Sequence, residues 1–148
     1  KNIWKAKARK VYVTLEKLSF LKATSGSDVQ SETIIQTNEI SISATSGAAI
    51  EIDVEAESVA TSTTSGSDIK ITGTTINHAS NATSGSSIDA YDLKSDNTIA
   101  KATSGASINI YASKKMEGKA TSGGNIDFKG NPTAINKEAS SGGSVSKQ

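Results

Sequence analysis

The sequence has 148 residues, a formal net charge of +1 at pH 7 and no cysteine. This length fits a single domain, and so small a charge gives no overall field that would attract nucleic acid or an anionic membrane. The lack of cysteine excludes disulfide bonds and thiol metal sites. The sequence contains no run of about 18 apolar residues, which a membrane-spanning helix would need. Aromatic residues make up only 4% of the chain, which is low for a compact globular core.

Residues 1–22 differ in pattern from the rest of the chain. From Val11 to Leu15, aliphatic residues alternate with Tyr12 and Thr14. This period of two is typical of a strand with one buried face, so we expect an N-terminal strand segment here. The chain opens at Lys1 rather than at methionine, and we therefore expect a product shortened at its N-terminus.

From residue 23 onward, one short phrase occurs seven times: Ala-Thr-Ser-Gly, or a close variant, followed by an aliphatic residue three positions after the glycine. The glycines lie, by subtraction, 18 to 21 residues apart and are Gly26, Gly47, Gly66, Gly85, Gly105, Gly123 and Gly142. The aliphatic residues are Val29, Ile50, Ile69, Ile88, Ile108, Ile126 and Val145. A repeat of this length predicts one solenoid coil per copy, with the aliphatic residue facing inward.

Three segments of each copy show strand character: one just after the glycine, one in mid-copy near residues such as Leu93 and Met116, and one just before the next glycine, as in 99–103. Three short strands in about twenty residues predict an all-β protein, a right-handed single-stranded parallel β-helix with coils of 19–20 residues. We expect a single domain over 1–148, with the N-terminal strand segment over 1–22 and the seven Ser-Gly-cornered coils over 23–148.

Stacking places like positions of successive coils beside one another, at the inter-strand spacing of about 4.8 Å. At the corner, glycine supplies the positive φ of the bend. At the position four residues after each glycine, we expect an outward column in which Lys70 lies between Glu51 and Asp89. These unlike charges reduce repulsion along the column, although each exposed pair contributes only about 0–1 kcal/mol.

The last copies carry a resemblance to a known family. The stretch from Gly123 to Pro132 and the later run from Ser141 to Val145 resemble the C-terminal signature of the bacterial head GIN domains, an auto-transporter adhesin family. Residues 11–15 resemble the strand before the first corner there. The resemblance implies a β-helical fold, further β segments before Lys1, and an exported protein at the cell surface, periplasm or outer membrane of a Gram-negative bacterium. It implies no catalytic residues.

Two sets of residues could carry catalytic or metal-binding chemistry: the single histidine and a row of carboxylates. His78 is the only histidine, and although Ser80 lies near it, we interpret it as a solvated loop residue rather than a catalytic base. Carboxylates at Glu51, Asp53, Glu55 and Glu57 alternate along one strand, with Asp68 and Asp89 on later coils, and could hold calcium or act on polysaccharide. Intervals of 18 to 21 residues leave no long loops to build a cleft, so we interpret the row as a solvated outer face.

The sequence therefore favours a non-enzymatic cell-surface module that presents flat polar β-ladders for contact with a protein or a glycan. We assign no catalytic, metal-binding or cofactor-binding residue, and no ligand site can be named. The alternative is a carbohydrate-active β-helix enzyme using the Glu51, Asp53 and Asp89 region. Self-association through the open ends of the solenoid is a further hypothesis.

Overall fold

Strand-forming alternation, interrupted at the Ser-Gly phrases, gives twelve strands and no helix in the part of the chain that the structure describes, residues 10–15 and 17–148. The structure is a computed structural model. Its strands are β1 (Phe20–Thr24), β2 (Asp28–Gln30), β3 (Ile35–Thr45), β4 (Ala49–Thr64), β5 (Asp68–Ala82), β6 (Ser87–Ala90), β7 (Leu93–Thr103), β8 (Ser107–Tyr111), β9 (Lys115–Thr121), β10 (Asn125–Lys129), β11 (Ala134–Ala139) and β12 (Ser144–Lys147).

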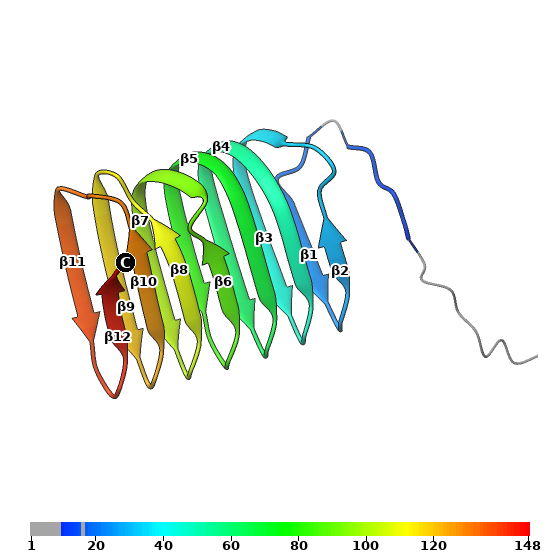
Figure 1. Cartoon of the computed structure of the whole chain (residues 1–148). Helices are drawn as coiled ribbons and strands as arrows, with labels where there is room; N and C mark the ends of the chain where they lie inside the picture. Colours follow the sequence, from blue (N-terminus) through cyan, green and yellow to red (C-terminus); the bar gives the residue numbers. More distant parts are fainter. Residues whose placement is uncertain (1–9, 16) are drawn as a thin grey trace, which may run out of the picture.

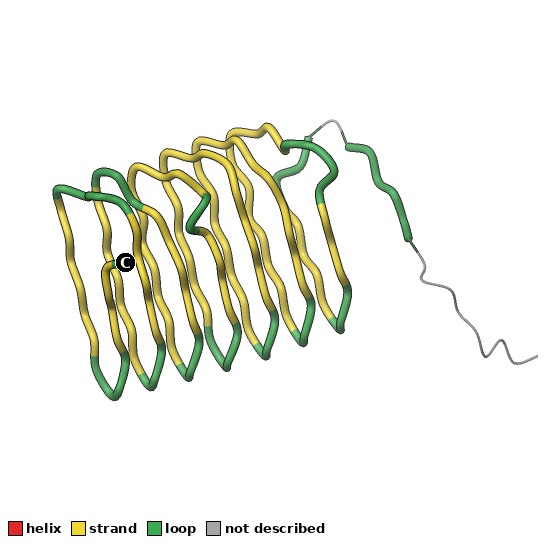
Figure 2. The backbone as a smooth tube through the Cα atoms, in the orientation of Figure 1, coloured by secondary structure: helices red, strands yellow, loops and turns green. Residues whose placement is uncertain are grey.

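The strands wind into a flattened solenoid in which each coil pairs in parallel with the next (Figure 1). Two layers of strands meet at a row of tight turns along one edge (Figure 2). We call the layer that precedes the turns the pre-turn wall; it contains β1, β3, β7, β9, β11 and the C-terminal parts of β4 and β5. The layer that follows them is the post-turn wall. The parallel β-solenoid predicted from the sequence is confirmed.

Each coil contains two β segments rather than the predicted three. The mid-copy segment and the segment before the corner are one strand, as β7 shows by running from Leu93 to Thr103. In β4 even the two walls form one continuous strand of 16 residues. The reason is that only the Ser-Gly phrase supplies a tight turn in every copy. At the opposite edge the chain bends gradually, and the in-out alternation shifts by one residue there, as the two successive exposed residues Ile76 and Asn77 of β5 show.

The corner is a two-residue turn in which serine and glycine both adopt positive φ. Across the seven turns φ is 51 to 58° for serine and 66 to 78° for the following glycine. The N–H of Ser27 donates to the carbonyl of Thr24 at 3.3 Å, which closes the first turn. Positive φ at both central residues defines a type I′ turn. The sequence analysis assigned this conformation to glycine alone, so the serine is an addition from the structure.

The predicted inward column is confirmed. Ile50, Ile69, Ile88, Ile108 and Ile126 are at most 2% exposed, and Val29 and Val145 at the two ends are partly buried. The seven residues are neighbours in one continuous register from coil to coil. Three residues before each glycine, a second inward column consists of small side chains, such as Ala44, Thr63 and Ala82. These small residues fit where the two walls converge.

The N-terminal segment differs from its prediction. Residues 10–15 form no strand, and Val11, Val13 and Leu15 are 57 to 82% exposed. The first strand is β1, which begins at Phe20. Residues 1–9 and 16 lie outside the described part, so the rest of that predicted segment is untested. The alternation in 11–15 has no neighbouring strand to pair with in this structure, and period-two patterning forms a strand only where a pairing partner exists.

Candidate functional site

The carboxylate row of β4 lies on the outer surface, as predicted, and its members are spread along the strand instead of gathered at one point. Glu51 accepts a hydrogen bond from Lys70 Nζ at 2.7 Å. This contact with Glu51 raises the pKa of Lys70 above its ordinary value. Glu55 accepts from the amide of Gln36 on the preceding coil at 2.9 Å. Two of the four acids thus have a side-chain partner on a neighbouring coil, and only Glu51 of the four pairs with a cation in the described residues.

The structure does not bring together the three acids of the enzyme alternative. Glu51, Lys70 and Asp89 are register neighbours in that order, so the coil of Lys70 separates the two carboxylates. Asp53 lies two residues after Glu51 on β4, and its register neighbour on the next coil is Thr72. Asp53 therefore does not lie beside Asp89. Within residues 10–15 and 17–148, no group of three or more His, Asp or Glu side chains is placed to hold a metal ion.

The interpretation of His78 as a solvated loop residue is wrong. His78 lies in β5, is 2% exposed, and its Nε2 is 3.0 Å from Thr61 Oγ1. Thr61 also donates to Ser80 at 3.3 Å, inside the same wall. Burial lowers the pKa of His78 to about 4, so the ring is neutral at pH 7. An enclosed imidazole whose Nδ1 has no partner cannot reach a substrate outside the solenoid.

An alignment of the sequence repeats could have predicted that His78 is buried. His78 lies beside Val59 on one side and Thr98 on the other, in an inward column that begins with Ile40 and continues to Met116. Aligning the copies on their glycines gives His78 the same inward position as these buried residues. The sequence analysis aligned only the residues that follow the glycine.

A groove of about 450 Å³ lies on the outer face of the pre-turn wall. We call it the pre-turn groove. It crosses β3, β4, β5 and β7, which are successive coils of the wall. Its lining residues are Ser19, Glu39, Ile40, Ser41, Ser58, Val59, Ala60, Asn77, His78, Ala79, Asn97 and Ile99.

The floor of the pre-turn groove is a column of small outward residues. Ser41, Ala60 and Ala79 are register neighbours on three successive coils. The same column continues to Phe20 at one end and to Ile99 at the other. Phe20 is 57% and Ile99 45% exposed, so large apolar side chains bound a stretch of small ones. This change in side-chain size forms the hollow.

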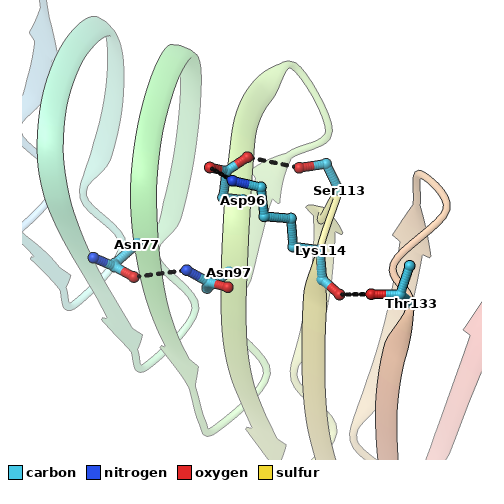
Figure 3. Close-up of polar contacts among 6 residues, drawn as sticks. All are labelled: Asn77, Asp96, Asn97, Ser113, Lys114 and Thr133. Atoms are coloured by element: carbon cyan, nitrogen blue, oxygen red, sulfur yellow. Dashed lines mark hydrogen bonds and ion pairs between the residues drawn. The ribbon is translucent and has the colours of Figure 1, made fainter.

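One long rim of the groove is polar. Glu39, Ser58, Asn77 and Asn97 form the next outward column, two residues earlier on each strand. Asn97 Nδ2 donates to Asn77 Oδ1 at 3.1 Å, so the two amides lie side by side across two coils (Figure 3). Glu39 is the only acidic or basic residue that lines the groove apart from the neutral His78.

The polar contacts continue past the groove toward the bend. Asp96 accepts from Lys114 Nζ and from Ser113 Oγ, each at 2.8 Å, and Thr133 donates to the carbonyl of Lys114 (Figure 3). The contact with Lys114, and secondly with Ser113, lowers the pKa of Asp96. These residues tie three successive coils together at the edge opposite the Ser-Gly turns.

A smaller hollow of about 200 Å³ lies on the post-turn wall around Ala49. Asp28 and Asp68 are the register neighbours of Ala49, and Glu51, Lys70 and Asp89 lie along the next column. Lys70 already bonds Glu51 in this hollow. The charged residues that line this hollow are therefore mainly carboxylates, with Lys70 as the one cation, whereas the rim of the pre-turn groove consists of uncharged polar side chains and Glu39.

Comparison with known proteins now identifies the family. A family model described as "Putative auto-transporter adhesin, head GIN domain" matches residues 1–132. The chain belongs to this family. The resemblance drawn from Gly123 to Pro132 is therefore confirmed. No curated protein matches this head GIN domain chain, and no helix in its described residues is long and apolar enough to cross a membrane.

Two solved structures share the fold of this head GIN domain. One is a putative adhesin from Bacteroides fragilis, with a TM-score of 0.76 and 19% identity over 82% of this chain and 56% of that one. The other is a putative lipid binding protein from Parabacteroides distasonis, with a TM-score of 0.67 and 18% identity over 88% of this chain and 62% of that one. The chain thus spans somewhat more than half the length of each.

Proposed function

We propose that this head GIN domain is a non-enzymatic, exported contact module at the bacterial cell surface, which binds a protein or a glycan through the outer face of its pre-turn wall. The pre-turn groove carries the proposal, because it combines an apolar floor at Ala60 and Ala79 with free polar groups along one rim. Membership of an adhesin family and the adhesin from Bacteroides fragilis support the surface role.

The arrangement of the titratable groups supports a non-enzymatic role. The carboxylates of the enzyme alternative are spread along the wall, and one of them, Glu51, is paired with Lys70. General acid and base catalysis needs two groups that reach the same bond from a shared pocket. The single histidine is enclosed between the walls, where burial lowers its pKa to about 4.

The exposed outer edge of the last described coil supports self-association as a second mode of contact. Every residue of β11 is exposed, and its edge pairs only with β9. If a second copy continued the register, Glu138 of β11 would lie beside Lys22 of β1, and Val145 beside Val29. Unlike charges and matching aliphatic residues at these positions favour stacking of one copy on the next.

The test is binding of the fluorescently labelled chain to intact bacterial cells and to mucin-coated surfaces, measured by flow cytometry and plate fluorescence. We expect binding that falls at least tenfold with Ala79→Lys, which places a long cation on the exposed floor of the groove. Asn81→Lys is the matched control, because Asn81 is also exposed on β5 but does not line the groove. Equal binding of the two variants contradicts the proposal.

A depolymerisation assay on a polysaccharide panel, with and without calcium, tests the enzymatic alternative directly. We expect no turnover. Turnover that disappears with Asp53→Ala would replace the contact module by a carbohydrate-active enzyme.

A further inference from the structure

The polar rim of the pre-turn groove has unused hydrogen-bonding capacity at a regular spacing. Glu39, Ser58, Asn77 and Asn97 are consecutive register neighbours, so they repeat at about 4.8 Å along the solenoid. After Asn97 donates to Asn77, the Asn77 amide nitrogen and the Asn97 amide oxygen remain free. Within the described residues, the carboxylate of Glu39 and the hydroxyl of Ser58 make no hydrogen bond.

The floor beside this rim is apolar at Ala60 and Ala79. The methyl groups of Ala60 and Ala79 face outward from adjacent coils, and Ile99 closes the groove beyond Ala79. The exposed ring of Phe20 lies at the other end, beside Ser41. A ligand that fits must place an apolar face on this floor and hydroxyl or amide groups along the rim.

Three ligand classes fit these features poorly. Anionic ligands, such as nucleic acid or acidic phospholipid, find no cation in the lining and would meet the carboxylate of Glu39. A peptide cannot add as a strand here, because β3, β4, β5 and β7 pair with one another beneath the groove and leave no free edge. A lipid chain would leave the polar rim unpaired on burial, at a cost of about 1–3 kcal/mol per group.

A pyranose sugar fits both requirements, because it has an apolar C–H face and a periphery of hydroxyl groups. We infer that the pre-turn groove binds a short segment of an uncharged glycan, with sugar C–H faces on Ala60, Ala79 and Ile99 and hydroxyl groups on the side chains of Glu39, Asn77 and Asn97. This inference rests on the proposed contact function and names its partner and site.

The experiment is isothermal titration of the chain with neutral trisaccharides of glucose, galactose, mannose and N-acetylglucosamine. A sialylated trisaccharide and vesicles of phosphatidylglycerol or phosphatidylcholine serve as the competing ligand classes. We expect at least one neutral trisaccharide to bind and the sialylated one and both vesicles not to bind. Asn77→Ala should weaken binding about three- to tenfold through lost hydrogen bonds, and Ala79→Lys should abolish it.

Asn81→Ala is the control for the same strand and wall, and should leave the affinity unchanged. All three substituted side chains are exposed, and circular dichroism confirms that each variant is folded. The inference is overturned if no neutral trisaccharide binds, if Ala79→Lys leaves binding intact, or if the vesicles bind in place of the sugars. If sugars fail while cell-surface binding still falls with Ala79→Lys, the contact function stands with another partner; if both fail, both proposals are wrong.

Discussion

The enclosed imidazole of His78 makes the stability of the solenoid depend on pH in a defined direction. Its pKa is about 4 in the folded protein, against 6.5 for the ordinary group. The unfolded chain therefore binds a proton more readily between these values, and protonation favours unfolding. The contribution of neutral His78 is complete above about pH 6.5, is lost progressively as the pH falls toward 4, and changes little below that.

The size of the effect follows from the two pKa values. Each unit of difference corresponds to about 1.4 kcal/mol, so the full loss is roughly 3 kcal/mol. Between pH 7.5 and pH 4.5 the expected loss from this group is roughly 2 to 3 kcal/mol. That is a large share of the 5–15 kcal/mol that stabilises a typical domain. The groups that face the ring, Thr61, Ser80 and Thr98, are uncharged and do not titrate in this range.

The measurement is the free energy of unfolding in urea, followed by far-ultraviolet circular dichroism at pH 7.5, 6.5, 5.5 and 4.5. His78→Val is the matched variant, because Val59 occupies the neighbouring position in the same inward column. Other groups, such as Asp96 and Glu138, titrate equally in both proteins, so the difference between the two isolates His78. The reasoning would be refuted if the difference in unfolding free energy between the wild type and His78→Val stayed constant from pH 7.5 to 4.5.

Three further predictions concern the column, the turns and the ends. Ile88→Asp should destabilise the protein by at least about 4 kcal/mol, because it buries an unpaired charge in the middle of the stack; thermal melting checks this, and Asp89→Ser on the outer face should melt like the wild type. Ser84→Gly should raise the stability by up to about 1 kcal/mol, because Ser84 has φ of 58°; a lower urea midpoint than that of the wild type would contradict it. Light scattering should show a mass that rises with protein concentration and falls with Lys22→Glu, and a strict monomer at every concentration would exclude stacking through the ends.

The inward column and the position of every turn could be predicted from sequence because both recur in every copy. The in-out alternation of strand residues also predicted that the row beginning at Glu51 faces outward. The register between coils confirms the predicted order Glu51, Lys70, Asp89. A sequence repeat reveals only the structural requirements that all coils share. Here those constraints are the tight turn and the narrow space next to it.

The number of strands per coil and the groove could not be read from the same recurrence. The bend opposite the turns has no shared residue: β5 has Gly73 there, with φ of 116°, while β4 continues through Val54 without a glycine. The groove arises from a local run of small residues, at Ala60 and Ala79, in a column that elsewhere has Phe20 and Ile99. Such differences between copies become visible only when register places them side by side.

In six of the seven turns the glycine N–H donates to the serine carbonyl of the following turn, at 3.1 to 3.2 Å. These bonds, like those between the strands, point along the long axis of the molecule. A pulling force applied between the two ends therefore acts on one inter-coil interface at a time, and the terminal coil peels away before its neighbours yield. Each peeled coil of about 19 residues lengthens the chain by roughly 60 Å, so a solenoid of this design would extend stepwise under tension and dissipate mechanical work while its remaining coils stay folded.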